Sequence, residues 1–278
     1  MMKHKIDTNE LKKIEFELLC EFHNICEAQG FRYSLGGGTL LGAVRHQGFI
    51  PWDDDIDVMM PRPDYDKFLS YCKNNEVPFR TKSFETDNRY VDMSSKICNP
   101  NTILEENDIL EEDEKFGVYI DIFPIDGLGK TYKEAKKQFQ ATSFKRNLLI
   151  AAQWRKFQKS KTHSWYYEPI RFVFYLLAKF INKSKTFEKI QKRYMDIDFD
   201  TVNFVGAVGG SYREKEILPQ QVFIEYTDFL FEGESFKVIS AYDTYLSSIY
   251  GDYMTLPPEE KRVSHHTFTA YYKEVDGQ

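Results

Sequence analysis

Cysteine is scarce in this chain of 278 residues, and long apolar runs without charge are absent. The four cysteines form no CxxC pair and have no metal-ligand spacing, so we expect reduced thiols and exclude a disulfide framework. No stretch of 18 uncharged apolar residues occurs, and the first residues lack the apolar segment of a secretory signal. The sequence therefore predicts a cytoplasmic protein without a membrane span.

Residues that build a core are abundant. Hydrophobic residues make up 42% of the chain, aromatic residues 16% and charged residues 29%. This balance is typical of a folded globular protein and excludes disorder as the main state. The length fits one large domain, or one domain with a helical annex.

Charge is distributed unevenly along the chain. The net charge is −6, yet residues 130–193 contain 17 Lys or Arg and only three acids. We infer that this basic part meets something anionic, with an ordinary solvated helical face as the alternative. Nucleic acid is not the expected partner, because the whole chain is acidic and contains no recognisable nucleic-acid module.

Hydrophobic periodicity and turn residues predict an α+β fold, a mixed sheet with flanking helices. Region 130–195 is poor in glycine and predicts two or three helices. We place the domain boundary at residues 129–130, which gives a core over 1–129 and then, over 130–278, a basic helical segment followed by a small mixed part that completes the site. The other expected helices span 7–29, 40–46, 64–73 and 242–250, and the expected strands span 31–35, 55–59, 79–97 (two or three), 117–123, 204–208 and a hairpin over 222–239.

A glycine run lies between an expected strand and an expected helix. Gly36, Gly37, Gly38 and Thr39 form this run, and glycine lets the backbone approach an anion closely. A helix start adds unpaired N–H groups and a positive dipole end, so the run predicts a phosphate site, with a plain tight turn as the alternative. It is neither a Walker loop nor a GxGxxG fingerprint, because Leu41 occupies the last glycine position.

Carboxylates alternate shortly after the glycine run. Asp53, Asp55 and Asp57 all point to one face if they lie on a strand, and they repel one another unless a cation sits among them. Mg²⁺ suits such oxygen-rich sites and usually bridges them to substrate phosphates. An EF-hand is excluded, because Val58 stands where its loop requires glycine.

A further acid, Asp121, lies within the apolar strand over 117–123. A lone carboxylate in such a strand is costly unless it is paired or binds a metal, so Asp121 is the expected third metal ligand. We expect the strand to close at Pro124 and at a turn over Asp126 and Gly127, which gives Asp126 an ordinary turn role.

These motifs together resemble the LicD family of the nucleotidyltransferase-fold superfamily. That family includes bacterial phosphocholine transferases, with fukutin-type ribitol-phosphate transferases as relatives. The resemblance rests on GGTLLGAVRH at 37–46, GFIPWDDDIDV at 48–58, IDIFPIDG at 120–127, YGDYM at 250–254 and LPPEEKR at 256–262. It touches both ends of the chain, and the first motif is long and specific.

The resemblance implies a nucleotidyltransferase-like catalytic core over 1–129 and a role for each matching residue. The expected phosphate-binding residues are Gly37, Gly38, Thr39 and Arg45, and the expected metal-binding and catalytic residues are Asp55, Asp57 and Asp121. Asp121 is also the expected general base, and Asp53 an outer-shell acid. For Arg45, packing on the helix surface is an equal alternative. His46 is a weak acid–base candidate, and we expect His265 and His266 to be solvated or packed rather than zinc ligands.

The resemblance further implies a Mg²⁺-dependent transfer of phosphocholine from CDP-choline to a hydroxyl of a cell-surface glycan precursor, as in teichoic acid or lipopolysaccharide, with release of CMP. Ribitol phosphate or another CDP-activated group is an alternative. Two other classes stay open: a nucleotide-sugar glycosyltransferase with the DxD motif Asp55–Asp57, and a degenerate nucleotide-binding protein. Tyr242, Tyr250 and Tyr253 are candidates for a quaternary-ammonium cage, with core packing as their ordinary role.

The basic region contains an apolar stretch over 170–181, preceded by aromatic residues at 165–167. Flanking Lys and Arg make this composition suitable for a helix at an anionic membrane surface. The family resemblance implies a lipid-linked acceptor at the inner face of the cell membrane, where such docking would be useful. The alternative is an internal helix packed on the catalytic sheet.

Overall fold

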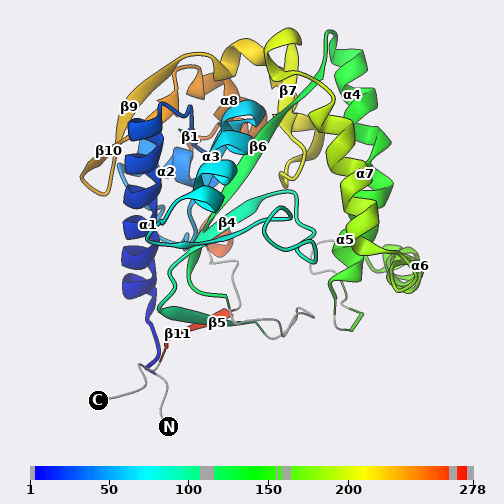
Figure 1. The fold of residues 1–278 in the computed structure, drawn as a ribbon, viewed down its shortest axis with the longest axis horizontal. Coiled ribbons are helices and arrows are strands. Elements are labelled where there is room, and N and C mark those ends of the chain that lie inside the picture. The colour runs from blue at the N-terminus through cyan, green and yellow to red at the C-terminus, as the bar shows by residue number, and fades with distance from the viewer. Residues whose placement is uncertain are drawn as a thin grey trace.

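The computed structural model describes residues 4–106, 116–154, 156–157, 159, 164–262 and 268–273. As predicted, its architecture is α+β, with helices placed around a mixed sheet (Figure 1). The α-helices are α1 (Thr8–Gln29), α2 (Gly37–His46), α3 (Arg62–Asn74), α4 (Tyr132–Ala141), α5 (Ser143–Ala152), α6 (Glu168–Ala178), α7 (Lys183–Met195) and α8 (Tyr242–Tyr250). The strands are β1 (Ser34–Leu35), β2 (Asp57–Pro61), β3 (Arg80–Lys82), β4 (Ser95–Cys98), β5 (Thr102–Glu106), β6 (Tyr119–Gly129), β7 (Phe204–Ala207), β8 (Leu218–Pro219), β9 (Tyr226–Phe231), β10 (Glu234–Ile239) and β11 (Phe268–Tyr272).

Strand β6 is the centre of the main sheet. The strand order is β1-β2-β6-β4-β3, and β7 pairs with the second half of β6 and carries β8 on its other edge. β2 and β6 run parallel, whereas the other pairs are antiparallel. Two separate antiparallel pairs, the hairpin of β9 and β10 and the pair of β5 with β11, complete the described strands. The side chains of β6 therefore lie close to segments from both halves of the chain.

The expected end of the β6 strand is wrong. The strand continues through Pro124 to Gly129, and Asp126 is fully buried within it instead of forming a turn. Asp126 accepts a 2.7 Å hydrogen bond from Arg62 Nε, so its charge is matched inside the core. Gly127 lies against the backbone of Ile197, where a Cβ would come within 2.8 Å of the carbonyl oxygen. Asp126 and Gly127 therefore serve close packing in the core, although an Asp-Gly pair in a sequence usually indicates a turn.

Strand β2 is shorter at its start than predicted. Because it begins at Asp57, Asp53 and Asp55 precede it, and the three acids do not share one strand face. The Asp53 N–H donates to the Ile50 carbonyl oxygen at 2.9 Å, which closes a turn where the alternation suggested extended chain. Only Asp57 of the three is held by the sheet.

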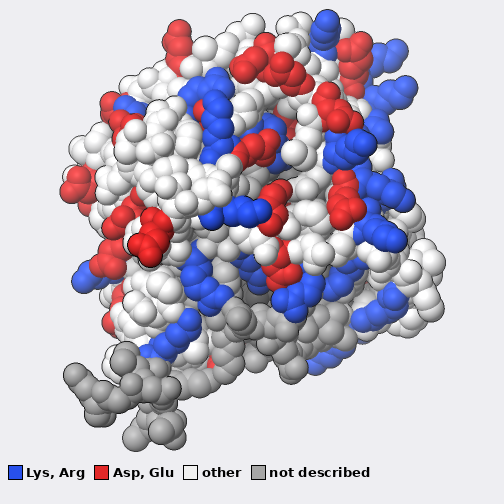
Figure 2. Space-filling model, viewed as in Figure 1, with Lys and Arg blue, Asp and Glu red and all other residues white. Residues whose placement is uncertain are grey.

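The described residues of the basic region form four α-helices, α4 to α7, where two or three were expected. Phe139 of α4, Leu149 of α5 and Tyr194 of α7 are buried in one cluster with Leu128 of β6, which holds these helices against the end of the sheet. Figure 2 shows Lys and Arg gathered along the side of the molecule that α4 and α7 form.

Helix α6 lies at the outer edge of this helical part (Figure 1). Its inner face packs on α5 through Phe174 and Ala178, which contact Leu148 and Ala151. Helix α6 therefore does not pack on the sheet as an internal helix, which was the alternative to docking at a membrane. No helix within the described ranges has the length and apolar character needed to cross a membrane.

Segments far apart in the sequence share the main core. The largest cluster joins residues of α1, β2, α3 and β6 to residues from the last third of the chain, among them Phe223, Phe231 and Leu246. β11, which the sequence did not predict, pairs with β5 beside the start of α1. The predicted helix over 242–250 and the hairpin are confirmed, and the Asp7 side chain caps α1 as expected.

Candidate active site

Two carboxylates stand side by side at the start of the parallel strands. Asp57 of β2 and Asp121 of β6 are register partners, and the Asp121 N–H donates to the Ile56 carbonyl oxygen at 2.9 Å. Because side chains at paired positions of adjacent strands point to the same face, the sheet brings these two acids together. The structure therefore brings together two of the three acids that were expected to bind a metal.

The two acids of the pair have different surroundings. Asp121 accepts hydrogen bonds from Lys96 Nζ at 2.7 and 2.9 Å and from Ser94 Oγ at 3.1 Å. Desolvation raises the pKa of Asp57 well above its ordinary value, Asp55 and Asp121 raise it further, and Lys96 opposes the rise. Repulsion by Asp55 and Asp121 thus exceeds the attraction of Asp57 to Lys96, and a second cation would relieve it.

Lys96 was not singled out from the sequence, yet it is the cation nearest the pair in these contacts. Burial disfavours its charge, but Asp121 and the neighbouring Tyr119, Tyr90 and Asp92 outweigh that effect and raise its pKa. Its Nζ lies 3.7 Å from the centre of the Tyr119 ring. The sequence offers little signal for it, because Lys96 lies in the short strand β4 between Ser95 and Ile97.

The glycine run forms the first turn of α2, directly beside Asp57. The Gly36 N–H donates to the Asp57 carbonyl oxygen at 2.8 Å, and the N-cap Gly36 brings no side chain to the helix start. Gly37 has a φ of +45°, and a Cβ there would lie 3.0 Å from Asp57 Oδ2. At Gly38 a Cβ would lie 2.5 Å from Asp53 Oδ2. Glycine is therefore required on steric grounds, and the uncapped helix start faces the acids.

Thr39 has a structural partner inside this turn. Its buried hydroxyl oxygen accepts the Asp57 N–H at 2.9 Å, so it fixes the start of β2 to α2. The hydroxyl hydrogen can still donate to a bound oxygen. Gly37 N–H donates to the hydroxyl of Tyr245 at 3.3 Å, which ties α8 to the same turn.

Arg45 and His46 lie at the other end of α2. Eight residues of helix, at 1.5 Å each, place Arg45 about 12 Å along the axis from Gly37. Its Nη1 donates to the Tyr253 carbonyl oxygen at 2.7 Å, so it anchors the C-terminal segment. Burial, and then Arg45, lower the pKa of His46. The structure thus does not bring Arg45 to the glycine turn, and the packing alternative describes its contacts. His265 and His266 lie outside the described residues.

A buried glutamate underlies the acidic loop. Glu15 of α1 is 2% exposed, and its Oε2 has no hydrogen-bond partner among the described residues. Burial raises its pKa, and Asp55 and Asp54 raise it further. The charge of Asp55 therefore acts on both Glu15 and Asp57, although Asp55 lies outside the strand.

A small cavity opens beside Gly37 and Asp57, and part of its wall comes from the last third of the chain. Tyr212, Tyr245 and Glu216 line it, together with Phe123 of β6. Glu216 is 4% exposed, its Oε1 accepts the Tyr212 N–H at 2.9 Å, and burial raises its pKa to about 7. Sequence reasoning missed Glu216, because it lies in the charged run REKE, which looks like solvated surface.

Tyr242, Tyr250 and Tyr253, the candidates for a cage, are not among the residues that line this small cavity. Tyr250 packs edge-on against Tyr212 with ring centres 5.1 Å apart, so it supports the cavity wall. Tyr242 packs against Phe229, and the Tyr253 hydroxyl donates to Asp243 at 2.7 Å. The aromatic wall next to the acids is built by Tyr212 and Tyr245 instead.

The carboxylate pair fits a magnesium ion that is completed by substrate. Among the described residues, no three His, Cys, Asp or Glu side chains are gathered in a group that could hold a metal. Mg²⁺ commonly takes one or two carboxylates and fills its other positions with water and substrate phosphates. Asp57 and Asp121 supply that donor set, and the repulsion on Asp57 favours a cation there. Asp55 as a third ligand stays a prediction.

Comparison with known proteins agrees with these motifs. The family model described as "LicD/FKTN/FKRP, nucleotidyltransferase domain" matches residues 30–164. The chain is 31% identical over 279 residues to the lipopolysaccharide cholinephosphotransferase LicD of Haemophilus influenzae, an alignment that covers 96% of this chain and 98% of that protein. Ribitol 5-phosphate transferase FKRP of human and of mouse is 59% identical over 34 residues, which is 12% of this chain and 7% of FKRP.

Proposed function

The chain belongs to the LicD family, and we propose that it transfers phosphocholine from CDP-choline to a hydroxyl of a cell-surface glycan. The observation that carries the proposal is the pair Asp57 and Asp121 beside the glycine turn, in a chain that aligns with a cholinephosphotransferase over nearly its full length. Its sheet is then of the nucleotidyltransferase type. As a LicD-type transferase, the chain has the carboxylates and the helix start that phosphoryl transfer requires.

The donor diphosphate sits in this scheme at the start of α2. The N-cap Gly36 brings no capping side chain, so the first turn offers the positive end of the helix dipole, although its Gly37 N–H already donates to the Tyr245 hydroxyl. Mg²⁺ held by Asp57 and Asp121, with Asp55 close by, supplies charge neutralisation for the phosphates when it is bound. The positive charge of Lys96 is paired with the Asp121 carboxylate.

The transfer itself needs one proton acceptor. The acceptor hydroxyl oxygen forms a bond to the phosphorus that carries choline, the bond from that phosphorus to the CMP oxygen breaks, and the hydroxyl proton passes to a carboxylate. We assign that role to Asp121, which is held in place by Lys96 and Ser94. Positioning and electrostatic stabilisation account for most of the acceleration in such reactions.

The small cavity beside Asp57 supports a cationic head group. Tyr212, which is 37% exposed, offers aromatic surface and Glu216 offers a carboxylate, which are the groups that bind quaternary ammonium ions. Ribitol has no charge to match Glu216. This contrast favours choline over ribitol within the same reaction class.

The exposed face of α6 supports peripheral contact with the membrane that carries the acceptor. Nine large apolar side chains between residues 165 and 180 are exposed, including Trp165 at 82% and Phe180 at 89%. Lys156, Lys159 and Lys179 are exposed around them, which complements an anionic lipid surface. Aromatic rings with a basic rim are typical of helices that lie in the interface. We therefore propose that the protein works at the inner face of the cell membrane, on a lipid-linked glycan.

A donor panel tests the proposed reaction. With Mg²⁺, we expect CDP-choline to raise the unfolding temperature and to release CMP, whereas CDP-ribitol and UDP-sugars should do neither. Glu216→Gln should raise the KM for CDP-choline at least about tenfold. Release of UMP from a UDP-sugar would identify a glycosyltransferase, and no release from any donor would indicate a degenerate nucleotide-binding protein.

A further inference from the structure

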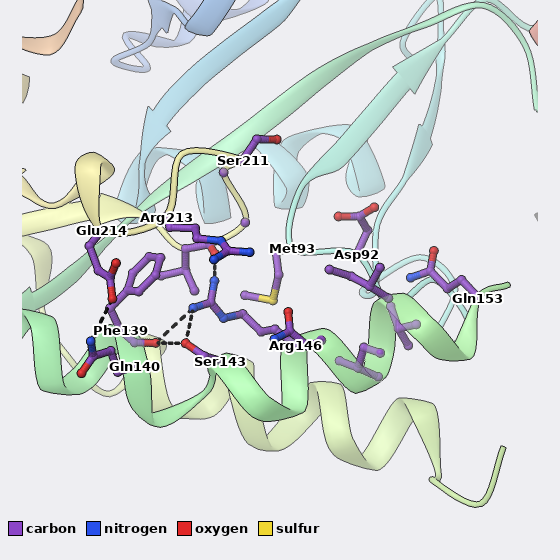
Figure 3. A pocket seen from close by; sticks show the side chains of 17 residues that line it. Asp92, Met93, Phe139, Gln140, Ser143, Arg146, Gln153, Ser211, Arg213 and Glu214 are labelled. Atoms are coloured by element: carbon purple, nitrogen blue, oxygen red, sulfur yellow. Dashed lines mark hydrogen bonds between the residues drawn. The ribbon is translucent and has the colours of Figure 1, made fainter. Parts of the chain in front are cut away.

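A cavity of about 740 Å³ lies between the helical part and the sheet (Figure 3). One wall comes from Asp92 and Met93, just before β4, and another from residues 208–211, just after β7. Helices α4 and α5 form the third wall with Arg146 and Gln153 among their side chains. The volume lies within the range of small-molecule sites.

We propose that this cavity binds the sugar unit of the acceptor glycan, so that one of its hydroxyls faces Asp121. The proposal rests on the function proposed above and adds a second binding site to it. It has three supports, which are the position of the cavity, the chemistry of its lining and the rigidity of its walls.

The cavity adjoins the carboxylate pair. Ser94 Oγ lies 3.4 Å from Asp92 Oδ1 and 3.1 Å from Asp121 Oδ1, so one side chain bridges the cavity wall to the proposed base. Gly210 and Ser211 line this cavity and also the small cavity beside Asp57. A ligand here is therefore adjacent to the phosphate site without overlapping the glycine turn.

The lining suits a neutral polyol. Two acids, Asp92 and Glu214, are balanced by two bases, Arg146 and Arg213, so the cavity shows no preference for an anion such as the donor diphosphate. Amide and hydroxyl side chains at 140, 143, 147 and 153 both donate and accept hydrogen bonds, as sugar hydroxyls do. Apolar side chains at 93, 149, 150 and 208 offer contact for the C–H face of a sugar ring.

A nucleobase fits the lining less well. The aromatic ring among the seventeen lining residues belongs to Phe139, which is 2% exposed. The Arg146 guanidinium carbon lies 4.3 Å from the centre of that ring and covers it. A cytosine would therefore find no open ring to stack on, although stacking is the usual support for a base.

The walls are held by bonds between elements. Arg146 donates to the carbonyl oxygens of Val208 and Phe139, the latter at 3.0 Å, and so ties α5 to the end of β7 and to α4. Gln140 Nε2 donates to Glu214 Oε1 at 2.8 Å, which ties α4 to the loop after β7 (Figure 3). Arg213 has a φ of +57°, a conformation that costs free energy in a non-glycine residue and is often found at binding sites.

Two tryptophan variants on α5 test the site. Asn147 lines the cavity and Lys145 does not, and both are exposed on the same helix, so Asn147→Trp fills the cavity while Lys145→Trp is the matched control. Saturation-transfer NMR with methyl glycosides of galactose, glucose and N-acetylglucosamine measures sugar binding, and calorimetry with CDP-choline and Mg²⁺ measures donor binding. We expect wild type and Lys145→Trp to bind at least one glycoside, and Asn147→Trp to bind it at least about tenfold more weakly, with unchanged donor affinity.

Three results would overturn the proposal: no glycoside binds wild type, Asn147→Trp binds as well as the control, or Asn147→Trp loses donor affinity, which would place the donor nucleoside in the cavity. If Asn147→Trp does not fold, Gln153→Ala removes one polar contact without added bulk and should weaken the same glycoside. Failure of the proposed donor is distinguishable, because wild type would then bind the glycoside but not CDP-choline.

Discussion

Asp57 and Asp121 are paired across the parallel strands β2 and β6, although more than sixty residues separate them in the sequence. Asp121 is bound by Lys96 on its other side, and Asp57 is repelled by both Asp121 and Asp55. This asymmetry leaves one acid compensated and the other in need of a cation.

Loss of any of the site acids should abolish transfer. Asp55→Asn, Asp57→Asn and Asp121→Asn should each lower kcat for CMP release at least about 100-fold, since such sites work mainly by electrostatic stabilisation. The unfolding temperature of Asp55→Asn and Asp57→Asn should stay near that of wild type, whereas Asp121→Asn should lower it because Lys96 loses its paired charge. The exposed Asp196→Asn should keep full activity. Near-normal turnover in Asp57→Asn would refute the assignment.

Magnesium binding should be measurable in the absence of catalysis. We expect Mg²⁺ with CMP to raise the unfolding temperature of wild type and of Asp196→Asn, because a ligand that binds only the folded state stabilises it. Asp57→Asn and Asp121→Asn should show no such rise, and EDTA should abolish it in wild type. An equal rise in all four proteins would place the metal elsewhere.

Gly37→Val should block donor binding. Its Cβ would lie 3.0 Å from Asp57 Oδ2 in the space expected for phosphate, and a φ of +45° is unfavourable for valine. Gly233, with a φ of +88° and no atom within 4 Å of a Cβ, is the matched control for the backbone cost. Calorimetry should show lost CDP-choline affinity in Gly37→Val alone. If both variants bind the donor as wild type does, the glycine run is only a turn.

Glu216 should make stability depend on pH. Its pKa rises from an ordinary 4.5 to about 7 in the folded chain, so the folded state holds the proton more tightly than the unfolded state. Below pH 4.5 the group has no effect, and between pH 4.5 and 7 it should remove up to about 3 kcal/mol from the free energy of unfolding. Urea unfolding at pH 5 and pH 8 should show this loss in wild type and in the exposed Glu225→Gln, but not in Glu216→Gln. The same loss in Glu216→Gln would assign the effect to other groups.

The exposed face of α6 should bind anionic vesicles. We expect cosedimentation with vesicles that contain phosphatidylglycerol, and weaker binding at high salt. Serine at positions 172, 176 and 180 should abolish binding, and Lys/Arg→Ala changes within 179–193 should weaken it. The matched control places serine at Leu230 and Leu256, which are also exposed apolar residues. No vesicle binding at low salt, or an equal loss of binding in the control, would contradict membrane docking. The exposed face of α6 would then be assigned to another partner, such as a second copy of the chain.

Local patterns in the sequence were enough to identify the family motifs, the α+β class and most elements. The glycine run before a helix and the acid inside an apolar strand could be recognised because each depends on neighbouring residues. The same local view failed where packing decides. Asp126 and Gly127 look like a turn, but a buried ion pair with Arg62 and the contact with Ile197 keep β6 extended.

Only the tertiary structure decided which side chains meet at the site. Strand register placed Asp57 beside Asp121 and Lys96 against them, and register is a property of the sheet rather than of any one segment. Folding also brought Glu216 and Tyr245 from the last third of the chain to the glycine turn, and brought the Tyr253 carbonyl oxygen to Arg45. Sequence determined the types of group available, because local spacing sets helix and strand. Their distances, their burial and hence their pKa values arose from long-range packing, which no local pattern contains.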